Sequence, residues 1–153
     1  MATPRIATSA EQPINRHAGT ASYQGQEAEL VGLDANGDVV KADADSGVAQ
    51  PAHGVLFSPV DDGANYVAEI VQNVVDANRT TPGDRVTFVR YGVEIENADE
   101  DWNFTPGDRV YLAAGGGFTQ TMPSTAGDLQ QVVGFALTAE RIMLDVSTDY
   151  STA

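Results

Sequence analysis

The sequence predicts an all-β protein: one small β-barrel or sandwich-like domain over residues 21–153, with an extended N-terminal arm over residues 1–20. One hexapeptide, Thr-Pro-Gly-Asp-Arg-Val, occurs at 81–86 and again at 105–110, an offset of 105 − 81 = 24 residues. Both copies run into segments in which apolar residues alternate with other residues, and such alternation after a turn indicates a β-strand. The sequence shows no convincing helical period longer than two turns.

Each hexapeptide carries proline followed by glycine, as Pro82-Gly83 and Pro106-Gly107. Proline presets φ near about −65° and glycine accepts a positive φ, which suits the two central positions of a type II turn. We therefore expect these four residues to be structural turn positions. Two interpretations remain open: the repeat marks equivalent edges of the domain, or a similar strand entry was needed twice.

The first expected β-unit is a hairpin, because Asn36-Gly37 between two apolar segments is the strongest short-range hairpin signal. A later stretch repeats the same order of features, namely an apolar strand, a glycine turn and, after a polar connection, another apolar strand. The matched positions are Leu33 with Leu112 and Gly37 with Gly116 at an offset of 79, and Gly54 with Gly134 at an offset of 80. We interpret this as an internal duplication, with chance matches as the alternative.

The charge balance is strongly acidic. The chain has 22 Asp and Glu residues against 8 Lys and Arg, a formal net charge of −14, and Lys41 is the single lysine. Such a surface repels phosphate backbones, so direct nucleic-acid binding is not expected. An acidic, lysine-poor surface is similar to that of haloarchaeal proteins, because molar salt shortens the Debye length to roughly 3 Å and screens self-repulsion. The alternative is an ordinary acidic protein of a mesophile.

Other compositional features exclude further classes. No apolar run approaches the roughly 18 residues that a membrane helix needs. Residues 1–17 contain no apolar segment of the kind found in secretory signals, so neither a membrane nor an export signal is expected. The chain has no cysteine, which removes disulfides, thiolate nucleophiles and zinc–thiolate sites together.

The residues give no positive support for catalysis. His17 and His53 are isolated in the sequence, no Gly-x-Ser-x-Gly motif occurs, and the run of three glycines at 115–117 lacks the features of a phosphate-binding loop. The turn at 34–38 matches part of a calcium-loop pattern, but Val39 stands where that pattern requires glycine, so a hairpin turn is the favoured interpretation. We predict no enzymatic activity, no cofactor and no metal site.

The first twenty residues show no strand or helix period and few apolar side chains. Such a segment has no core of its own, so we expect it to be held by something outside the domain, most simply a neighbouring chain. Its best anchors are Pro4, Ile6, Pro13 and Ile14. An extended arm can add a strand to the edge of a neighbour's sheet, with backbone hydrogen bonds supplying much of the affinity.

The order of motifs from residue 80 to residue 147 resembles the capsid cement, or head decoration, proteins of tailed viruses. The matching features are Gly-Asp-Arg-Val with Tyr-Gly-Val-Glu, a second Gly-Asp-Arg-Val with Tyr-Leu, a glycine turn with Phe-Thr, Val-Gly-Phe-Ala-Leu, and a terminal alternating strand. The resemblance covers about half of the chain, and the order and spacing of its motifs are more specific than any single motif. The N-terminal half and the acidity depart from the shorter members of that family.

The resemblance implies a β-domain, typically a homotrimer, that sits on the outside of an icosahedral shell and clamps neighbouring major capsid protein subunits. It implies no catalytic residues, and a location on the outer capsid surface of a virion that is assembled in the host cytoplasm. Together with the acidity, it suggests a haloarchaeal virus. The affinity of such a protein gains from many low-area contacts acting together on one lattice.

Two other functions compete with this one. The first is a β-sandwich module on a virion or cell surface that binds glycans or a receptor through exposed aromatic residues, namely Trp102, Tyr91 and Tyr150. The second is a hydrolase that uses scattered carboxylates. A groove with clustered aromatics would favour the first, and a concave pocket with a strongly shifted carboxylate would favour the second.

Overall fold

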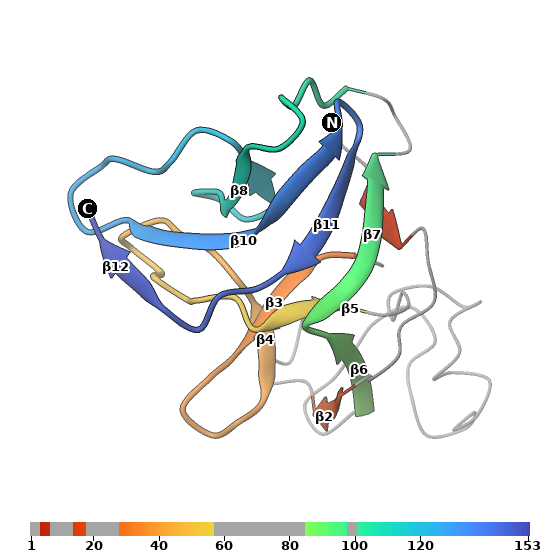
Figure 1. The fold of residues 1–153 in the computed structure, drawn as a ribbon. Helices are drawn as coiled ribbons and strands as arrows, with labels where there is room; N and C mark the ends of the chain where they lie inside the picture. Colours follow the sequence, from red (N-terminus) through yellow and green to blue (C-terminus); the bar gives the residue numbers. More distant parts are fainter. Residues whose placement is uncertain (1–3, 7–13, 18–27, 57–84, 98–100) are drawn as a thin grey trace.

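The computed structural model describes residues 4–6, 14–17, 28–56, 85–97 and 101–153. All the regular secondary structure in these residues is β-strand (Figure 1). The all-β prediction is therefore confirmed. In this part of the chain no helix is long and apolar enough to cross a membrane.

The strands form two sheets. The larger has the order β1-β7-β11-β10-β8-β9, with β12 also pairing β10; its strands are β1 (Pro4–Ile6), β7 (Tyr91–Asn97), β8 (Arg109–Leu112), β9 (Phe118–Thr119), β10 (Leu129–Thr138), β11 (Arg141–Asp145) and β12 (Tyr150–Thr152). The smaller has the order β2-β6-β5-β3-β4; its strands are β2 (Ile14–His17), β3 (Leu30–Leu33), β4 (Val39–Lys41), β5 (Gly54–Leu56) and β6 (Arg85–Val89). All pairings are antiparallel.

The main core lies between the sheets, as expected for a sandwich-like domain. Leu30, Val55 and Val89 of the smaller sheet belong to one buried cluster with residues of the larger sheet, which are Val93, Ile95, Val110, Leu112, Val133, Ala136, Ile142 and Leu144. A second buried cluster, Val31, Val39, Leu56 and Phe88, is built from the smaller sheet. Each fully buried Leu, Ile or Phe contributes about 1.5–3 kcal/mol of hydrophobic stabilisation.

Two segments of the expected arm are strands of this chain's own sheets. β1 pairs with β7, with Ile6 opposite Ile95, and β2 pairs with β6, with Ile14 opposite Phe88. The sequence shows no strand period in this stretch, because three or four residues are too few to show one. The physical reason for the pairing is that β6 and β7 would otherwise each present an unpaired row of backbone groups at a sheet edge.

The internal duplication is visible in the backbone. The hairpin β3–β4 recurs as β8–β9 with the offset 109 − 30 = 79, and both turns have the same backbone hydrogen bonds. The amide of Gly37 donates to Asp34 O (2.9 Å) and that of Gly116 to Ala113 O (3.0 Å). The following strands also correspond, since β5 pairs β3 and β6 as β10 pairs β8 and β11.

The glycines matched in the third strand of each unit have the same role. A Cβ on Gly54 would lie 2.4 Å from Val89 O, and a Cβ on Gly134 would lie 2.2 Å from Met143 O. Neither contact is tolerable for a real side chain, because the obstacle is backbone rather than a flexible side chain. The close approach of a neighbouring strand therefore requires glycine at both positions, which makes chance a poor explanation of the match.

The hexapeptide repeat, in contrast, does not mark equivalent positions. Its second copy forms the expected type II turn: Gly107 has φ +87° and the amide of Asp108 donates to Thr105 O at 3.2 Å. Pro82 and Gly83 of the first copy lie outside the described residues. The strands that follow, β6 and β8, belong to different sheets and have different neighbours. The two copies thus precede strands that are not equivalent, and the repeat is separate from the duplication.

The buried side chain of Gln131 joins the two sheets. It is 1% exposed, and it makes a pair of hydrogen bonds with the backbone of Ala52, one as acceptor from the amide and one as donor to the carbonyl, both at 2.7 Å. Its Nε2 also donates to Ser147 O at 2.8 Å. The Gln131 side chain thereby makes the two hydrogen bonds to Ala52 that the backbone of a paired strand would make.

We expect Gln131→Leu to lower the free energy of unfolding by about 3 kcal/mol or more, because three backbone groups lose their partner and each costs roughly 1 kcal/mol or more. Denaturant unfolding measures this. The matched control is Gln130→Leu, next to it but only half-buried, which loses one bond to Pro123 O and one from Ser151 and should cost about 1 kcal/mol or less. Equal losses in the two variants would contradict the assignment.

We expect Gly107→Val to destabilise the protein by about 1–3 kcal/mol, because a β-branched residue resists a positive φ. A Cβ at this position would meet no atom within 4 Å, so the cost comes from the backbone alone. Asp108→Asn, in the same exposed turn, is the control and should leave the melting temperature nearly unchanged. If both variants melt like the parent, the turn does not constrain the fold.

Candidate docking surface

The four residues expected to anchor the arm are placed only in part. Pro4 and Ile6 lie in β1 and Ile14 begins β2, whereas Pro13 lies outside the described residues. These strands close one edge of each sheet, so the arm is in contact with its own domain there. The docking role of Pro4, Ile6, Pro13 and Ile14 stays a prediction.

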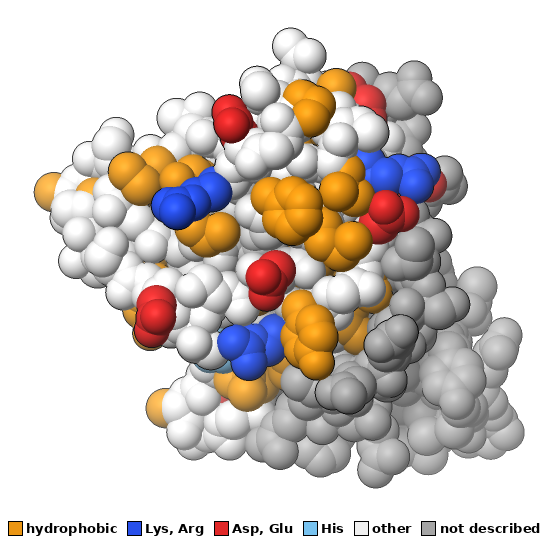
Figure 2. Space-filling model, in the orientation of Figure 1, with side chains coloured by type: hydrophobic (Ala, Val, Ile, Leu, Met, Phe, Trp, Pro, Cys, Tyr) orange, Lys and Arg blue, Asp and Glu red, His pale blue; other side chains and the backbone are white. Residues whose placement is uncertain are grey.

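The outer face of the larger sheet carries a second candidate surface. Cross-strand pairing aligns Arg109, Phe135, Met143 and Glu94, which come from β8, β10, β11 and β7 in that order. We call these four residues the outer row. Phe135 is 41% exposed, although its neighbours Gly134 and Ala136 are buried. Figure 2 shows hydrophobic side chains over β10 and β11 on this face, with charged groups on either side.

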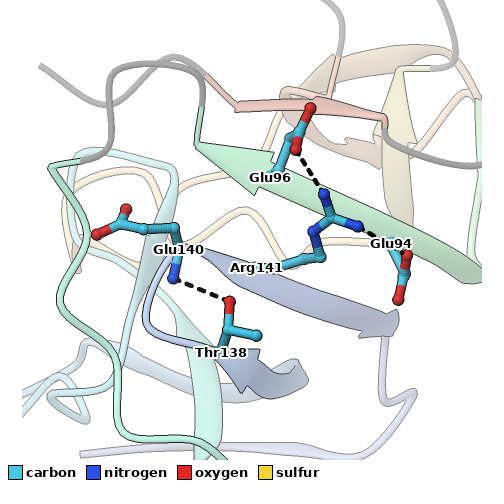
Figure 3. A network of polar contacts seen from close by, with 5 residues as sticks. All are labelled: Glu94, Glu96, Thr138, Glu140 and Arg141. Carbon is cyan, nitrogen blue, oxygen red and sulfur yellow. Dashed lines mark hydrogen bonds and ion pairs between the residues drawn. The ribbon is translucent and has the colours of Figure 1, made fainter.

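One end of the outer row is an ion-pair cluster. The Arg141 guanidinium contacts Glu94 at 3.3 Å and Glu96 at 2.8 Å across the β7–β11 pairing (Figure 3). The side chain of Glu140, in the turn before β11, points away from this cluster. Arg141 is 40% exposed, so the cluster contributes little to stability and its main effect is to set the charge of this end of the face.

The opposite end of the row is basic. Arg109 is exposed, and no carboxylate among the described residues forms an ion pair with it. The row therefore runs from a cation through two apolar side chains to an anion. The sequence predicted strands at β8, β10 and β11, but it did not indicate that the outer face of the larger sheet is a surface for contacts. The sequence signal for this surface was Phe135, a large apolar residue that alternates with the buried residues Gly134 and Ala136.

The aromatic residues proposed for glycan binding do not form a platform. Trp102 is only 8% exposed, and it stacks on Phe104 with ring centroids 4.9 Å apart and meets Phe118 edge-on at 5.6 Å. It is part of the core. Tyr91 and Tyr150 are exposed, at 56% and 49%, but they lie on different strands, β7 and β12, and no ring contact joins them.

The acidic turn at 34–38 behaves as the hairpin interpretation predicts. The Asp34 carboxylate accepts hydrogen bonds from the amides of Asn36 (2.8 Å) and Asp38 (3.0 Å), so its oxygen is used in shaping the turn. Among the residues that the structure describes, no group of three or more His, Asp or Glu side chains is arranged to hold a metal ion.

The side-chain amide of Asn97 donates a hydrogen bond to the Asp101 carboxylate, and this bond lowers the pKa of the exposed Asp101 carboxyl.

His53 has a structural position in the smaller sheet. Its Nδ1 accepts a hydrogen bond from the amide of Leu33 at 3.0 Å, which requires the neutral ring with the proton on Nε2. Partial burial lowers the pKa of His53, and the positive charge of Arg90 lowers it further. Protonation would remove the acceptor and place a second cation near Arg90.

This geometry predicts a pH dependence of stability. Because the folded pKa lies below the unfolded value, the unfolded chain binds the proton more readily, so the contribution of His53 is full above about pH 6.5 and is lost as the pH falls from there through the folded pKa. We expect His53→Asn, which keeps an acceptor but does not titrate, to be less sensitive than the parent to a drop from about pH 7 to 5. Parallel stability curves in denaturant would show that His53 has no such role.

Comparison with known proteins gives a structural likeness only. No family model matches the sequence, and no curated protein matches it. Among solved structures, a chain from Mycobacterium phage Patience is similar, with a TM-score of 0.60 and 14% sequence identity, over 95% of this chain and 97% of that chain. The likeness therefore extends over nearly the whole length of both chains, and at this identity it shows a shared fold.

Proposed function

We propose that this chain is a structural virion protein that decorates the outside of an icosahedral capsid and cements neighbouring major capsid protein subunits. The observation that carries the proposal is the likeness over nearly the whole chain to a phage chain of matching extent. The order of strand and turn motifs, which resembles the decoration proteins of tailed viruses, supports it independently. We propose no enzymatic role.

The architecture suits this task. A decoration protein needs a rigid body, and here two sheets share one buried core. It also needs surfaces for several weak contacts, because many copies on one lattice act together. The N-terminal strands and the outer face of the larger sheet are the two candidate contact regions, and the family resemblance adds a homotrimer as the decorating unit.

The test is to count this chain in purified virus particles against the major capsid protein. We expect many copies per particle, of the same order as the major capsid protein, and labelling of intact particles by an antibody against the chain. Only a few copies per particle would favour the receptor-binding alternative, and complete absence from particles would overturn a virion role.

The arm can be tested with the variant Ile6→Thr/Ile14→Thr, which keeps β-branched residues in β1 and β2 but reduces their apolar surface. If these residues dock on the capsid, occupancy on shells falls while the melting temperature of the isolated chain changes little. Reduced stability of the isolated chain with unchanged occupancy would assign both side chains to the domain itself.

A haloarchaeal source is a further part of the proposal, supported by the net charge of −14 and the single lysine. We expect the melting temperature to rise as salt increases from about 0.1 M to about 3 M, because the Debye length shrinks from roughly 10 Å to 2–3 Å and self-repulsion is screened. Thermal melts monitored by circular dichroism measure this. A flat or falling midpoint would remove the halophilic interpretation.

A further inference from the structure

The outer row has an order that is complementary to itself. Read across β8, β10, β11 and β7 it runs cation, aromatic, thioether, anion, as Arg109, Phe135, Met143 and Glu94. Neighbouring strands are about 4.8 Å apart, so the row spans roughly 14 Å. If a second copy faces this sheet across a two-fold axis that runs parallel to the strands between β10 and β11, the row meets its own reverse.

In that arrangement each group finds a suitable partner. Arg109 of each copy faces Glu94 of the other, and Phe135 faces Met143 twice. A carboxylate has acceptor sites for more than one guanidinium, so Glu94 can receive Arg109 while it keeps its contact with Arg141. Contacts between methionine sulfur and an aromatic ring are favourable, and complementary charges at the rim of an apolar centre fix the register of a contact and disfavour other alignments.

The net charge favours a second copy through this face. At low salt, two molecules of charge −14 repel each other, so a contact between copies is opposed least where acidic groups are few or are faced by cations. The outer row itself has one cation and one anion and so contributes no net charge. Phe, Met and Arg are also the residue types enriched in interfaces between proteins.

We propose that the outer face of the larger sheet is a two-fold contact between copies of this chain, centred on Phe135 and Met143 and aligned by Arg109 and Glu94. The contact is a property of the chain and does not rest on the capsid role. A face four strands wide buries less than the roughly 800 Å² per partner of a standard stable interface, so the contact is weak in dilute solution. On any lattice that holds copies side by side, the high local concentration populates it.

The test uses two charge reversals, Arg109→Glu and Glu94→Arg, in the full chain. Sedimentation is measured from about 10 μM to about 1 mM protein, at the lowest salt concentration at which each variant melts as a folded protein. In a pair formed by either variant alone, like charges face each other at both ends of the outer row. We therefore expect each variant to associate at least tenfold more weakly than the parent, which corresponds to about 1.4 kcal/mol. The equimolar mixture should recover association, because the carboxylate introduced in the first variant then faces the guanidinium introduced in the second, and the remaining wild-type charges match as well.

Matched controls reverse a charge elsewhere: Lys41→Glu at the exposed end of β4 and Asp149→Arg in the exposed segment before β12. Both should associate like the parent. The proposal is overturned if the parent shows no self-association at the highest concentration, if the two reversals leave association unchanged, or if their mixture fails to recover it. If the variant Phe135→Asp lowers occupancy on shells while the parent protein does not self-associate, this face contacts the capsid instead.

Discussion

The fold depends on how two similar β-units are held against each other. Their strands do not continue from one sheet into the other, so the backbone groups at the junction need partners from elsewhere. Gln131 supplies them with one buried side chain, which bonds the backbone of Ala52 and of Ser147. Ala44 adds backbone bonds to Ala113 and Leu129. A buried polar group of this kind stabilises a structure only when every bond is made, so it also specifies how the two units are aligned.

The two units differ in how deeply the outer face of each sheet is buried. In the smaller sheet Val31, Val39, Leu56 and Phe88 form a second buried cluster in addition to the main core. In the larger sheet the corresponding outer side carries Phe135 at 41% exposure together with charged groups. The two sheets therefore share their pairing, but the outer side is buried in the smaller sheet and partly exposed in the larger one. A pair of glycines, Gly54 and Gly134, keeps the shared backbone geometry in both.

Much of the strand content was predictable from local signals. The hairpin at 34–38, the turn at Pro106-Gly107 and the duplication all depend on residues whose backbone preferences are strong. Three things were not predictable. β1, β2 and β12 are too short to show a period, β10 begins at Leu129 because it pairs with the C-terminal strand, and alternation in β10 distinguishes two faces without saying which is covered. Trp102 shows the same limit, since an aromatic residue in an acidic loop can be either core or surface.

The edge positions of β1 and β2 have a consequence for how the chain reaches its native state. Ile14 pairs opposite Phe88 and Ile6 opposite Ile95, so residues that are synthesised early wait for partners 88 − 14 = 74 and 95 − 6 = 89 positions later. Such long-range antiparallel pairing slows folding, because loop-closure entropy must be overcome before the contacts form. Until β1 and β2 have paired, β6 and β7 have open edges, and pairing with other chains competes there with completion of the sheets.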